Sequence, residues 1–425
     1  ASIRCALLNA AAWTGLEWLR GILFSGFGWN GLGVAFHGDL LVLAQPADLI
    51  GVTGLSFLVV FTGTIFAATL RRLQLEIRSG TMRPHLDFAA AILLIILFFF
   101  YGIAKTTAKP PADPVIVDTL LVQANIPQEE KWDQAYVEEI YSIYKRLTLP
   151  IVSTIPVDLV LWPEAALPLE YYYNYKFHRT YFNELLAEND FSLVFGANEN
   201  AVGEGYFNSI MMMRGNTDSM EAYRKIHLVP FGEFVPFRGK IKLLNFLEEL
   251  ITGDFDRGTS TDPLPLTKPE PYSIIPMICF EDTIGRLTRK FVRPEPQLIV
   301  NCTNDGWFGE SSCALQHMAN AKFRCIELRR PMARAANTGV TGIIDETGSL
   351  DDRRQPGYDP RIISDAAPDP NTFVEGFMSA KISLDRNPPT TFYARFGDLF
   401  SILCGIGAIV ALAVRAITRK PPPTS

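Results

Sequence analysis

The chain has 425 residues, of which 48% are hydrophobic and only 20% are charged, and its formal net charge is −6. This length allows two domains, or one large domain together with membrane spans. The acidic balance, without a basic stripe interleaved with aromatics, excludes nucleic acid as a partner, and six cysteines without a C-x-x-C pair or Cys/His ligand spacing predict no metal site and no cofactor.

Four apolar segments are candidates for membrane spans, and they comprise residues 3–24, 49–70, 88–103 and 396–414. The first contains Arg4, Glu17 and Arg20 and is therefore the weakest candidate. The second carries no charge and is long enough to cross ~30 Å of hydrocarbon. Such runs can also be buried core helices, but three charge-poor segments of near-spanning length favour a membrane protein.

Basic residues in the short connections predict how the spans are oriented. Four arginines lie between residues 70 and 88, and three basic residues follow residue 414. Placing both groups in the cytoplasm is consistent with four spans and leaves residues 105–395 outside. We therefore expect a transmembrane region at 1–104, a catalytic domain at 105–395, and a last span with a basic tail at 396–425. The chain begins with Ala1 inside an apolar stretch, which suggests a processed or incomplete N-terminus.

Between residues 113 and 390, strands are predicted to alternate with helices. The predicted strands are 115–123, 157–162, 193–197, 209–213, 220–223, 273–279, 298–303, 332–337 and 342–345. The predicted helices are 134–147, 181–188, 283–292 and 314–325. This alternation is typical of an α/β domain in which helices cover the faces of the sheets. Residues 105–114 and 350–375 are rich in Pro and Asp and predict loops.

Cys279 ends the apolar strand 273–279 and is followed at once by Glu281 and Asp282. Strand ends are where catalytic groups gather in α/β folds, so this cysteine is a candidate nucleophile. By itself, however, a cysteine beside an apolar strand is more often an inert core residue.

Two further residues could complete a thiol-based site. Glu164 follows the strand 157–162, and Lys225 stands at the end of the strand 220–223. Attack of a thiol on a carbonyl needs a base for the S–H proton and a cation or N–H group for the oxyanion, and Glu164 and Lys225 could supply them. An ordinary turn acid and a solvated lysine remain the alternatives, because spacing cannot show that the three residues converge.

The segments Leu-Trp-Pro-Glu at 161–164, Lys-Ile-His-Leu-Val-Pro-Phe-Gly-Glu-Phe-Val-Pro at 225–236 and Ile-Cys-Phe-Glu at 278–281 resemble the Glu–Lys–Cys signature of the nitrilase (carbon-nitrogen hydrolase) superfamily. The spans, Asn-Asp-Gly-Trp-Phe-Gly at 304–309, and Gln-Ala-Asn-Ile-Pro-Gln at 123–128 with Lys131-Trp132 further resemble its membrane-bound branch, the apolipoprotein N-acyltransferase family. The resemblance covers about residues 13–415. Phe280 occupies a position that is often Tyr in that family.

This resemblance implies an α/β fold, a nitrilase-like αββα sandwich inserted between transmembrane helices. It also implies a two-step reaction in which Glu164 deprotonates Cys279, the thiolate takes an acyl group from a phospholipid, and Lys225 stabilises the oxyanion. The acyl group then passes to the N-terminal amine of a diacylglyceryl-apolipoprotein. The expected donor is phosphatidylethanolamine, and the expected setting is the bacterial inner membrane, with a monomer whose catalytic domain is periplasmic.

By the same resemblance, Glu233 supports the geometry of Lys225 and Cys279, whereas Glu281 has a structural or substrate-related role. Trp132 resembles an aromatic residue near the path of the acyl chain or phospholipid, although a packed core Trp fits nearly as well. Residues 231–252 are unusually apolar and predict a membrane-facing arm over the site, with core packing as the alternative. A second set, read as a buried ion-pair network between helix and sheet, comprises Arg324, Glu327, Arg330, Arg334 and Asn337.

Two rival functions remain open at this stage. A membrane-tethered amidase or nitrilase could use the same three residues to hydrolyse a small amide, with water as acceptor. A non-catalytic, lipoprotein-binding membrane module could carry a degenerate site. The apolar arm argues against the first rival, and the complete Glu164, Lys225 and Cys279 set argues against the second.

Overall fold

A computed structural model of the chain describes residues 2–167, 181–182, 185–186, 189–214, 220–235, 254–350 and 373–418. These residues form two compact units. The first unit comprises Ala1–Lys109, Ile326–Leu328 and Thr391–Ser425, and the second comprises Pro110–Cys325 and Arg329–Thr390.

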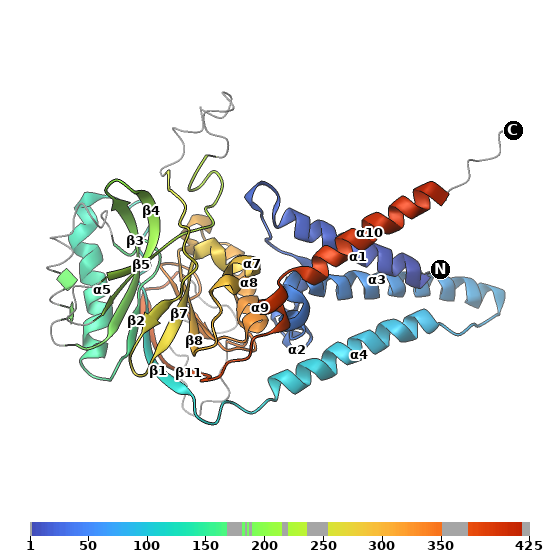
Figure 1. Ribbon diagram of the computed structural model, residues 1–425, viewed down its shortest axis with the longest axis horizontal. Coiled ribbons are helices and arrows are strands. Elements are labelled where there is room, and N and C mark those ends of the chain that lie inside the picture. Colours follow the sequence, from blue (N-terminus) through green and yellow to red (C-terminus); the bar gives the residue numbers. More distant parts are fainter. Residues whose placement is uncertain are drawn as a thin grey trace. The chain divides into compact units, whose positions relative to one another are not determined.

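The first unit is helical (Figure 1). Its α-helices are α1 (Ser2–Arg20), α2 (Leu41–Ala44), α3 (Ala47–Ser79), α4 (Leu86–Thr106), α9 (Phe392–Phe396) and α10 (Leu399–Thr418), with 3-10 turns η1 (Leu23–Ser25) and η2 (Leu32–His37). Among the described residues, α3, α4 and α10 are long and apolar enough to cross a membrane. Helix α1 forms where the first span was expected but is not one of these three, so the fourth span stays a prediction.

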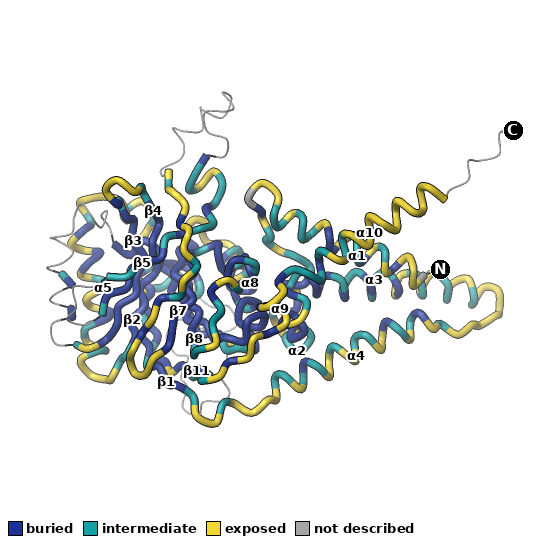
Figure 2. The backbone as a smooth tube through the Cα atoms, viewed as in Figure 1, coloured by how far each residue is buried: buried dark blue, intermediate teal, exposed yellow. Residues whose placement is uncertain are grey.

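Small residues allow helices α1 and α10 to approach each other closely. A Cβ atom added to Gly15 would lie 2.5 Å from the Cα of Gly405, so this contact requires glycine. Glycine contacts of this kind are a common basis of helix packing in membranes. Figure 2 shows long exposed stretches on α4 and α10, which carry exposed apolar side chains such as Leu97 and Ile409. Such surfaces are stable next to lipid.

The second unit contains two β-sheets. The six-stranded sheet has the order β11-β1-β2-β3-β4-β5, and the five-stranded sheet has the order β10-β9-β8-β7-β6. The strands of the first are β1 (Val115–Gln123), β2 (Leu159–Leu161), β3 (Ser192–Ala201), β4 (Gly205–Arg214), β5 (Met220–Arg224) and β11 (Gly376–Leu384). Those of the second are β6 (Leu264–Leu266), β7 (Tyr272–Ile278), β8 (Gln297–Thr303), β9 (Met332–Ala336) and β10 (Gly342–Ile344). The parallel pairs β1–β2, β2–β3, β7–β8 and β8–β9 bring strand carboxyl ends together.

Helices cover the two sheets on their outer sides. Helix α5 (Val137–Val152) follows the 3-10 turn η3 (Gln134–Tyr136) and packs on the six-stranded sheet, while α7 (Gly285–Thr288) and α8 (Cys313–Leu328) lie beyond the five-stranded one (Figure 1). Trp162 is fully buried in the hydrophobic core between α5 and the sheet, and it stacks on Tyr144 with ring centroids 4.6 Å apart. The predicted αββα sandwich is thereby confirmed.

One predicted helix is wrong. Residues 283–292 form short turns rather than a helix, because η5 (Cys279–Thr283), α7 and η6 (Arg289–Phe291) follow one another there. Ile284, at φ −114° and ψ 82°, interrupts the helical backbone. Glu281 and Asp282 are fully buried, so the chain turns inward at this point instead of presenting these acids to solvent.

Two strands were missed, β6 and β11. Strand β6 contains Pro265 at its centre, which argues against a strand from sequence, but it is an edge strand that pairs only with β7. Strand β11 lies antiparallel to β1, with Leu384 opposite Val115. A pairing so distant in sequence leaves no local pattern. The remaining predicted strands are confirmed, with ends shifted by a few residues.

Candidate active site

Each of the three predicted catalytic residues follows a strand. Glu164 lies three residues beyond the end of β2, Lys225 directly follows β5, and Cys279 directly follows β7. Glu164 and Lys225 are buried, whereas Cys279 is half-buried. The convergence that spacing could not establish therefore comes from the placement of three strand ends.

Lys225 lies between two carboxylates. Its Nζ is 2.8 Å from Oε1 of Glu233 and 3.7 Å from Oε1 of Glu164. Asn208 on β4 donates from its Nδ2 to the same two oxygens, at 2.8 Å to Glu164 and 3.0 Å to Glu233. The second carboxylate oxygen of Glu164, Oε2, is buried and has no hydrogen-bond partner within the described residues. A carboxylate oxygen without a hydrogen-bond partner is suited to accept a proton.

The charges in this cluster stabilise one another. Burial by itself would lower the pKa of Lys225, but the carboxylates of Glu233 and Glu164 more than reverse this and raise the pKa well above its ordinary value. Burial would likewise raise the pKa of Glu233, and the Lys225 ammonium group holds that pKa below its ordinary value. Lys225 is therefore a cation and Glu233 an anion at neutral pH.

Cys279 has a strained backbone, with φ at +50°, where a residue other than glycine is disfavoured. Burial raises the pKa of its thiol well above the ordinary value, and the Glu164 carboxylate raises it further, whereas Lys225 lowers it. The side chain of Thr303 hydrogen-bonds the sulfur and also lowers the pKa. The resting group is therefore a thiol, and a thiolate has to be generated with the help of a base.

Glu281 connects the Lys225 loop to the strand that precedes Cys279. Its carboxylate accepts hydrogen bonds from the main-chain N–H groups of Ile226 at 2.8 Å, His227 at 2.9 Å and Ile278 at 3.0 Å. The Tyr223 hydroxyl donates to both carboxylate oxygens at 2.9 Å. Burial raises the pKa of Glu281 to about 7. Both carboxylate oxygens are thus engaged by the main chain and by Tyr223, which favours a structural role.

A buried lysine, which the sequence analysis did not select, holds the main chain of Glu164. Lys131 is 1% exposed, and its Nζ donates to the carbonyl oxygen of Glu164 at 3.0 Å. Burial lowers its pKa to about 8, opposed by the Glu164 carboxylate. On the other side of this turn, a Cβ added to Gly196 would meet the Ala165 nitrogen at 2.5 Å. Ala165 itself has φ +46°, so the turn is tightly confined.

One feature of the sequence could have pointed to Lys131. It precedes Trp132 in the stretch 123–132, which resembles the N-acyltransferase family. Asn208 had none, because a single polar residue in strand β4, where Ser209 follows it, has no distinguishing pattern. Trp132 is 46% exposed, so the alternative of a packed core Trp is wrong. Phe231, at the start of the predicted arm, is 53% exposed. Residues 236–252 of that arm lie outside the described residues, as do residues 351–372 of the predicted loop at 350–375.

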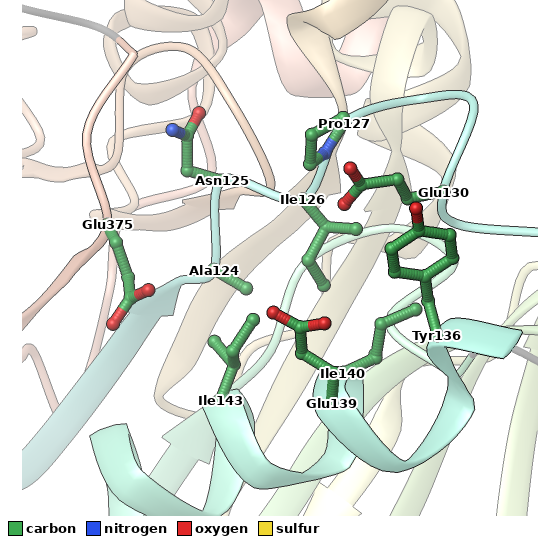
Figure 3. A pocket seen from close by; sticks show the side chains of 10 residues that line it. All are labelled: Ala124, Asn125, Ile126, Pro127, Glu130, Tyr136, Glu139, Ile140, Ile143 and Glu375. Carbon is green, nitrogen blue, oxygen red and sulfur yellow. The ribbon is translucent and has the colours of Figure 1, made fainter.

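A cavity of about 170 Å³ opens between the segment after β1 and helix α5 (Figure 3). Its lining combines apolar side chains such as Ile126 and Ile140 with the carboxylates of Glu130, Glu139 and Glu375. None of the three predicted catalytic residues lines it. Within the part of the chain that the structure describes, no three His, Cys, Asp or Glu side chains are grouped so as to hold a metal ion.

Comparison with protein families gives two matches. The carbon-nitrogen hydrolase family matches residues 121–363, which include Glu164, Lys225 and Cys279. The family described as the apolipoprotein N-acyltransferase N-terminal domain matches residues 2–65. The two matches together extend over both units of the chain.

Individual relatives agree with these families. An apolipoprotein N-acyltransferase of Geobacter metallireducens is 34% identical over 413 residues, covering 96% of this chain and 73% of the relative. One of Bradyrhizobium diazoefficiens is 32% identical over 435 residues, covering 98% of this chain and 74% of the relative. Among solved structures, a carbon-nitrogen hydrolase of Helicobacter pylori is 12% identical with a TM-score of 0.44, covering 72% of this chain and 99% of that one.

Proposed function

The chain belongs to the apolipoprotein N-acyltransferase family of the carbon-nitrogen hydrolase superfamily, and we propose that Glu164, Lys225 and Cys279 carry out its reaction. The enzyme is an acyltransferase that moves a fatty acyl group from a phospholipid, through a cysteine thioester, to the amine of an apolipoprotein. One observation carries the assignment of residues. The free oxygen of Glu164 and the ammonium group of Lys225 lie in one buried cluster that acts electrostatically on Cys279.

In the first half-reaction, Oε2 of Glu164 takes the proton of the Cys279 thiol, and the sulfur attacks the carbonyl carbon of a phospholipid ester. Negative charge develops on the carbonyl oxygen, where the Lys225 ammonium group stabilises it. The carbon–oxygen bond to the glycerol then breaks, and the leaving oxygen takes the proton back from Glu164. A lysophospholipid departs, and an acyl thioester remains on Cys279.

In the second half-reaction, the N-terminal amine of a diacylglyceryl-cysteine attacks the thioester carbonyl. Glu164 accepts the proton that the amine loses, and Lys225 again faces the developing oxyanion. The carbon–sulfur bond breaks, and the Cys279 sulfur regains a proton from Glu164. In each half-reaction, the carboxylate first accepts a proton from the attacking group and then returns it to the leaving atom. One carboxylate with a free oxygen is therefore sufficient for both.

Glu233 and Glu281 support this chemistry without contacting the reacting atoms. Glu233 holds the Lys225 ammonium group at 2.8 Å and accepts the main-chain N–H of Val229 at 2.8 Å. Glu281 fixes the main chain on both sides of the site through its bonds to Ile226 and Ile278. We assign both as positioning residues, and we keep Trp132, which is exposed, as a contact for a lipid chain.

The proposal divides the chain into a transmembrane region at 1–104, a periplasmic catalytic domain at 105–395 and a last span with a basic tail at 396–425. The apolar helices α3, α4 and α10 support a multi-pass arrangement in the inner membrane. The arginines in the last turns of α3 and in its link to α4 support the orientation. Phosphatidylethanolamine is the proposed donor. A monomer is the proposed working unit, because one chain supplies all three predicted catalytic residues.

The decisive experiment measures the acyl intermediate directly. Purified protein is mixed with phosphatidylethanolamine, and its intact mass is recorded before and after treatment with hydroxylamine, which cleaves thioesters. We expect one fatty-acyl adduct that hydroxylamine removes and that Cys279→Ala lacks. Addition of a diacylglyceryl-cysteine peptide should discharge the adduct onto the peptide amine.

Cys302→Ala is the matched control, because Cys302 is a fully buried cysteine opposite Ile278 in the neighbouring strand. This variant should form the adduct as the unmodified protein does. Turnover of a small amide without any lipid adduct would refute the proposed function and support a membrane-tethered amidase. An adduct that persists in Cys279→Ala would refute the assignment of the nucleophile.

A further inference from the structure

A second cluster of buried charges lies next to the nucleophile turn. It consists of Asp282, Asp305, His317 and Arg334, each no more than 1% exposed, and we call it the charge ring. Its members come from four elements: η5, the 3-10 turn η7 (Asp305–Phe308), α8 and β9. Of these four residues only Arg334 belonged to the predicted ion-pair network, and the acids that pair with it, Asp282 and Asp305, did not.

Each cation of the charge ring bridges both acids. His317 places Nδ1 2.7 Å from Oδ1 of Asp305 and Nε2 2.9 Å from Oδ1 of Asp282. Arg334 places Nη1 2.6 Å from Oδ2 of Asp282 and Nη2 3.1 Å from Oδ2 of Asp305. With His317 as an imidazolium, two positive charges balance two negative ones. A buried pair is tolerated only when its charges are compensated in this way.

The surroundings of His317 favour the imidazolium. Burial alone would lower its pKa, but the carboxylates of Asp282 and Asp305 more than offset both burial and the repulsion from Arg334 and raise the pKa to about 9. Arg324, on the same helix, donates to the main-chain oxygen of Asp282 at 3.2 Å. The ring of Phe308 meets the imidazole edge-on, with centroids 6.3 Å apart.

The charge ring reaches Cys279 by two routes. Asn301 donates from Nδ2 to Oδ2 of Asp282 at 2.9 Å and to the Cys279 carbonyl oxygen at 3.3 Å, and its own oxygen accepts from Arg334 at 3.2 Å. Thr303 hydrogen-bonds the Cys279 sulfur and lies 3.5 Å from Oδ1 of Asp305. The strained backbone of Cys279 is thus held by groups that the charge ring itself orients.

We infer that the charge ring is a positioning device for Cys279, which holds the strained turn and stays electrically neutral so that no uncompensated negative charge opposes the thiolate. This inference rests on the proposed function for the role of Cys279 as nucleophile. A set of ion pairs that merely stabilised the fold would make the reactivity of Cys279 insensitive to the sign of the net charge in the ring.

The test uses iodoacetamide and the full-length protein in detergent micelles at pH 8. The Cys279 thiolate displaces iodide, forming a carbon–sulfur bond, and the thiol proton passes to buffer. Peptide mapping gives the rate at Cys279, and Cys302 and Cys325, both fully buried, report unfolding if they become modified. Neither phospholipid nor apolipoprotein is needed, so this outcome is independent of the acyl-transfer experiment.

His317→Gln leaves the charge ring with a net charge of −1 and should slow alkylation of Cys279 ~10-fold, since a nearby like charge shifts a pKa by ~1 unit or more. Asp305→Asn leaves a net charge of +1 and should accelerate it ~3–10-fold. The double variant restores neutrality and should react within ~3-fold of the unmodified protein.

The two single variants are expected to change the alkylation rate of Cys279 in opposite directions. Damage to packing alone would not produce this difference. If His317→Gln does not fold, Asp305→Asn alone carries the test, because the inference requires it to be faster with Cys302 and Cys325 still protected. Equal rates in all the folded variants, or a slower Asp305→Asn, would overturn the inference. A double variant as slow as His317→Gln would also overturn it, because lost packing would then explain both.

Discussion

The two buried charge clusters of the catalytic unit differ in how closely each acid lies to the cations around it. In the cluster of Glu164, Lys225 and Glu233, Oε2 of Glu164 has no hydrogen-bond partner within the described residues, and Lys225 lies 3.7 Å from Glu164. In the charge ring, both cations lie within 3.1 Å of both acids. In the proposed mechanism the first cluster binds a proton and an oxyanion, whereas each acid of the charge ring already lies within ion-pair distance of both cations.

The comparison separates reactivity from positioning. An unsatisfied buried carboxylate oxygen costs free energy, and such a cost persists at sites where a reaction uses it. A closed set of buried pairs adds little net stability compared with apolar packing, but removing one member leaves an unpaired charge. Changes in the first cluster should therefore act mainly on rate, and changes in the charge ring mainly on stability and on the state of Cys279.

The largest effect is expected for Glu164→Gln, which removes the base but keeps the shape of the side chain. The rate of acyl-Cys279 formation should fall ~10³–10⁴-fold, within the range for loss of general-base catalysis. Rapid-quench intact-mass measurement with phosphatidylethanolamine gives this rate. Glu129→Gln, an exposed acid on the segment before Lys131, is the control and should react normally. A Glu164→Gln rate within tenfold of normal would contradict the assignment.

Lys225→Met should lower the same rate ~10²–10³-fold, because it removes the cation that faces the oxyanion. The protein should remain folded only if Glu233, left without its partner, becomes protonated. We therefore expect the loss of activity to be accompanied by lower stability above the ordinary pKa of a glutamate. Lys290→Met changes an exposed lysine and serves as the control. Retention of more than a tenth of the rate in Lys225→Met would show that main-chain N–H groups suffice.

The charge ring should make stability depend on pH. Since the pKa of His317 is raised from an ordinary 6.5 to about 9, its contribution is complete below pH 6.5 and is lost as pH rises to about 9. The difference amounts to at most ~3 kcal/mol. Denaturant unfolding across this interval should show the decline, and His317→Gln should remove it. An equal decline in both proteins would place its origin outside the charge ring.

The smallest effect is expected for Lys131→Met, which releases the Glu164 turn but keeps the volume of the side chain. The rate of acyl-Cys279 formation should fall ~10-fold, because the main chain of Glu164 loses one hydrogen bond from a charged group. Stability at pH 7 should stay equal or rise, because the buried ammonium group disappears. Lys145→Met, an exposed lysine on α5, is the control. Loss of stability together with activity would indicate a structural role only.

Local pattern was sufficient for most of the fold. Strand β1 was predicted with its observed bounds, since a run such as Val115–Gln123 is apolar, β-branched and flanked by loop residues. The apolar helices α3, α4 and α10 were equally visible, because a membrane span needs length and hydrophobicity alone. Strand β11 was missed because its partner β1 lies more than 250 residues away in sequence.

The candidate site was predictable to the extent that its residues occur in recognisable segments. Glu164, Lys225 and Cys279 were candidates because each was expected at a strand end, and the resemblance then selected them over the alternatives of a turn acid, a solvated lysine and a core cysteine. Asn208, Lys131 and His317 were not selected for the site, since each is a polar residue whose role depends on a contact made in the tertiary structure.

The sequence by itself determined the membrane character and, through segments that resemble a known family, the class of chemistry, because hydrophobic length and short motifs are local properties. The tertiary structure decided which charges remain unpaired. Glu164 keeps a free oxygen because Asn208 and Lys225 both lie on its other oxygen, while His317 is enclosed by acids from two separate turns. Distances between groups so far apart in sequence depend on the packing of whole strands, which no local pattern encodes.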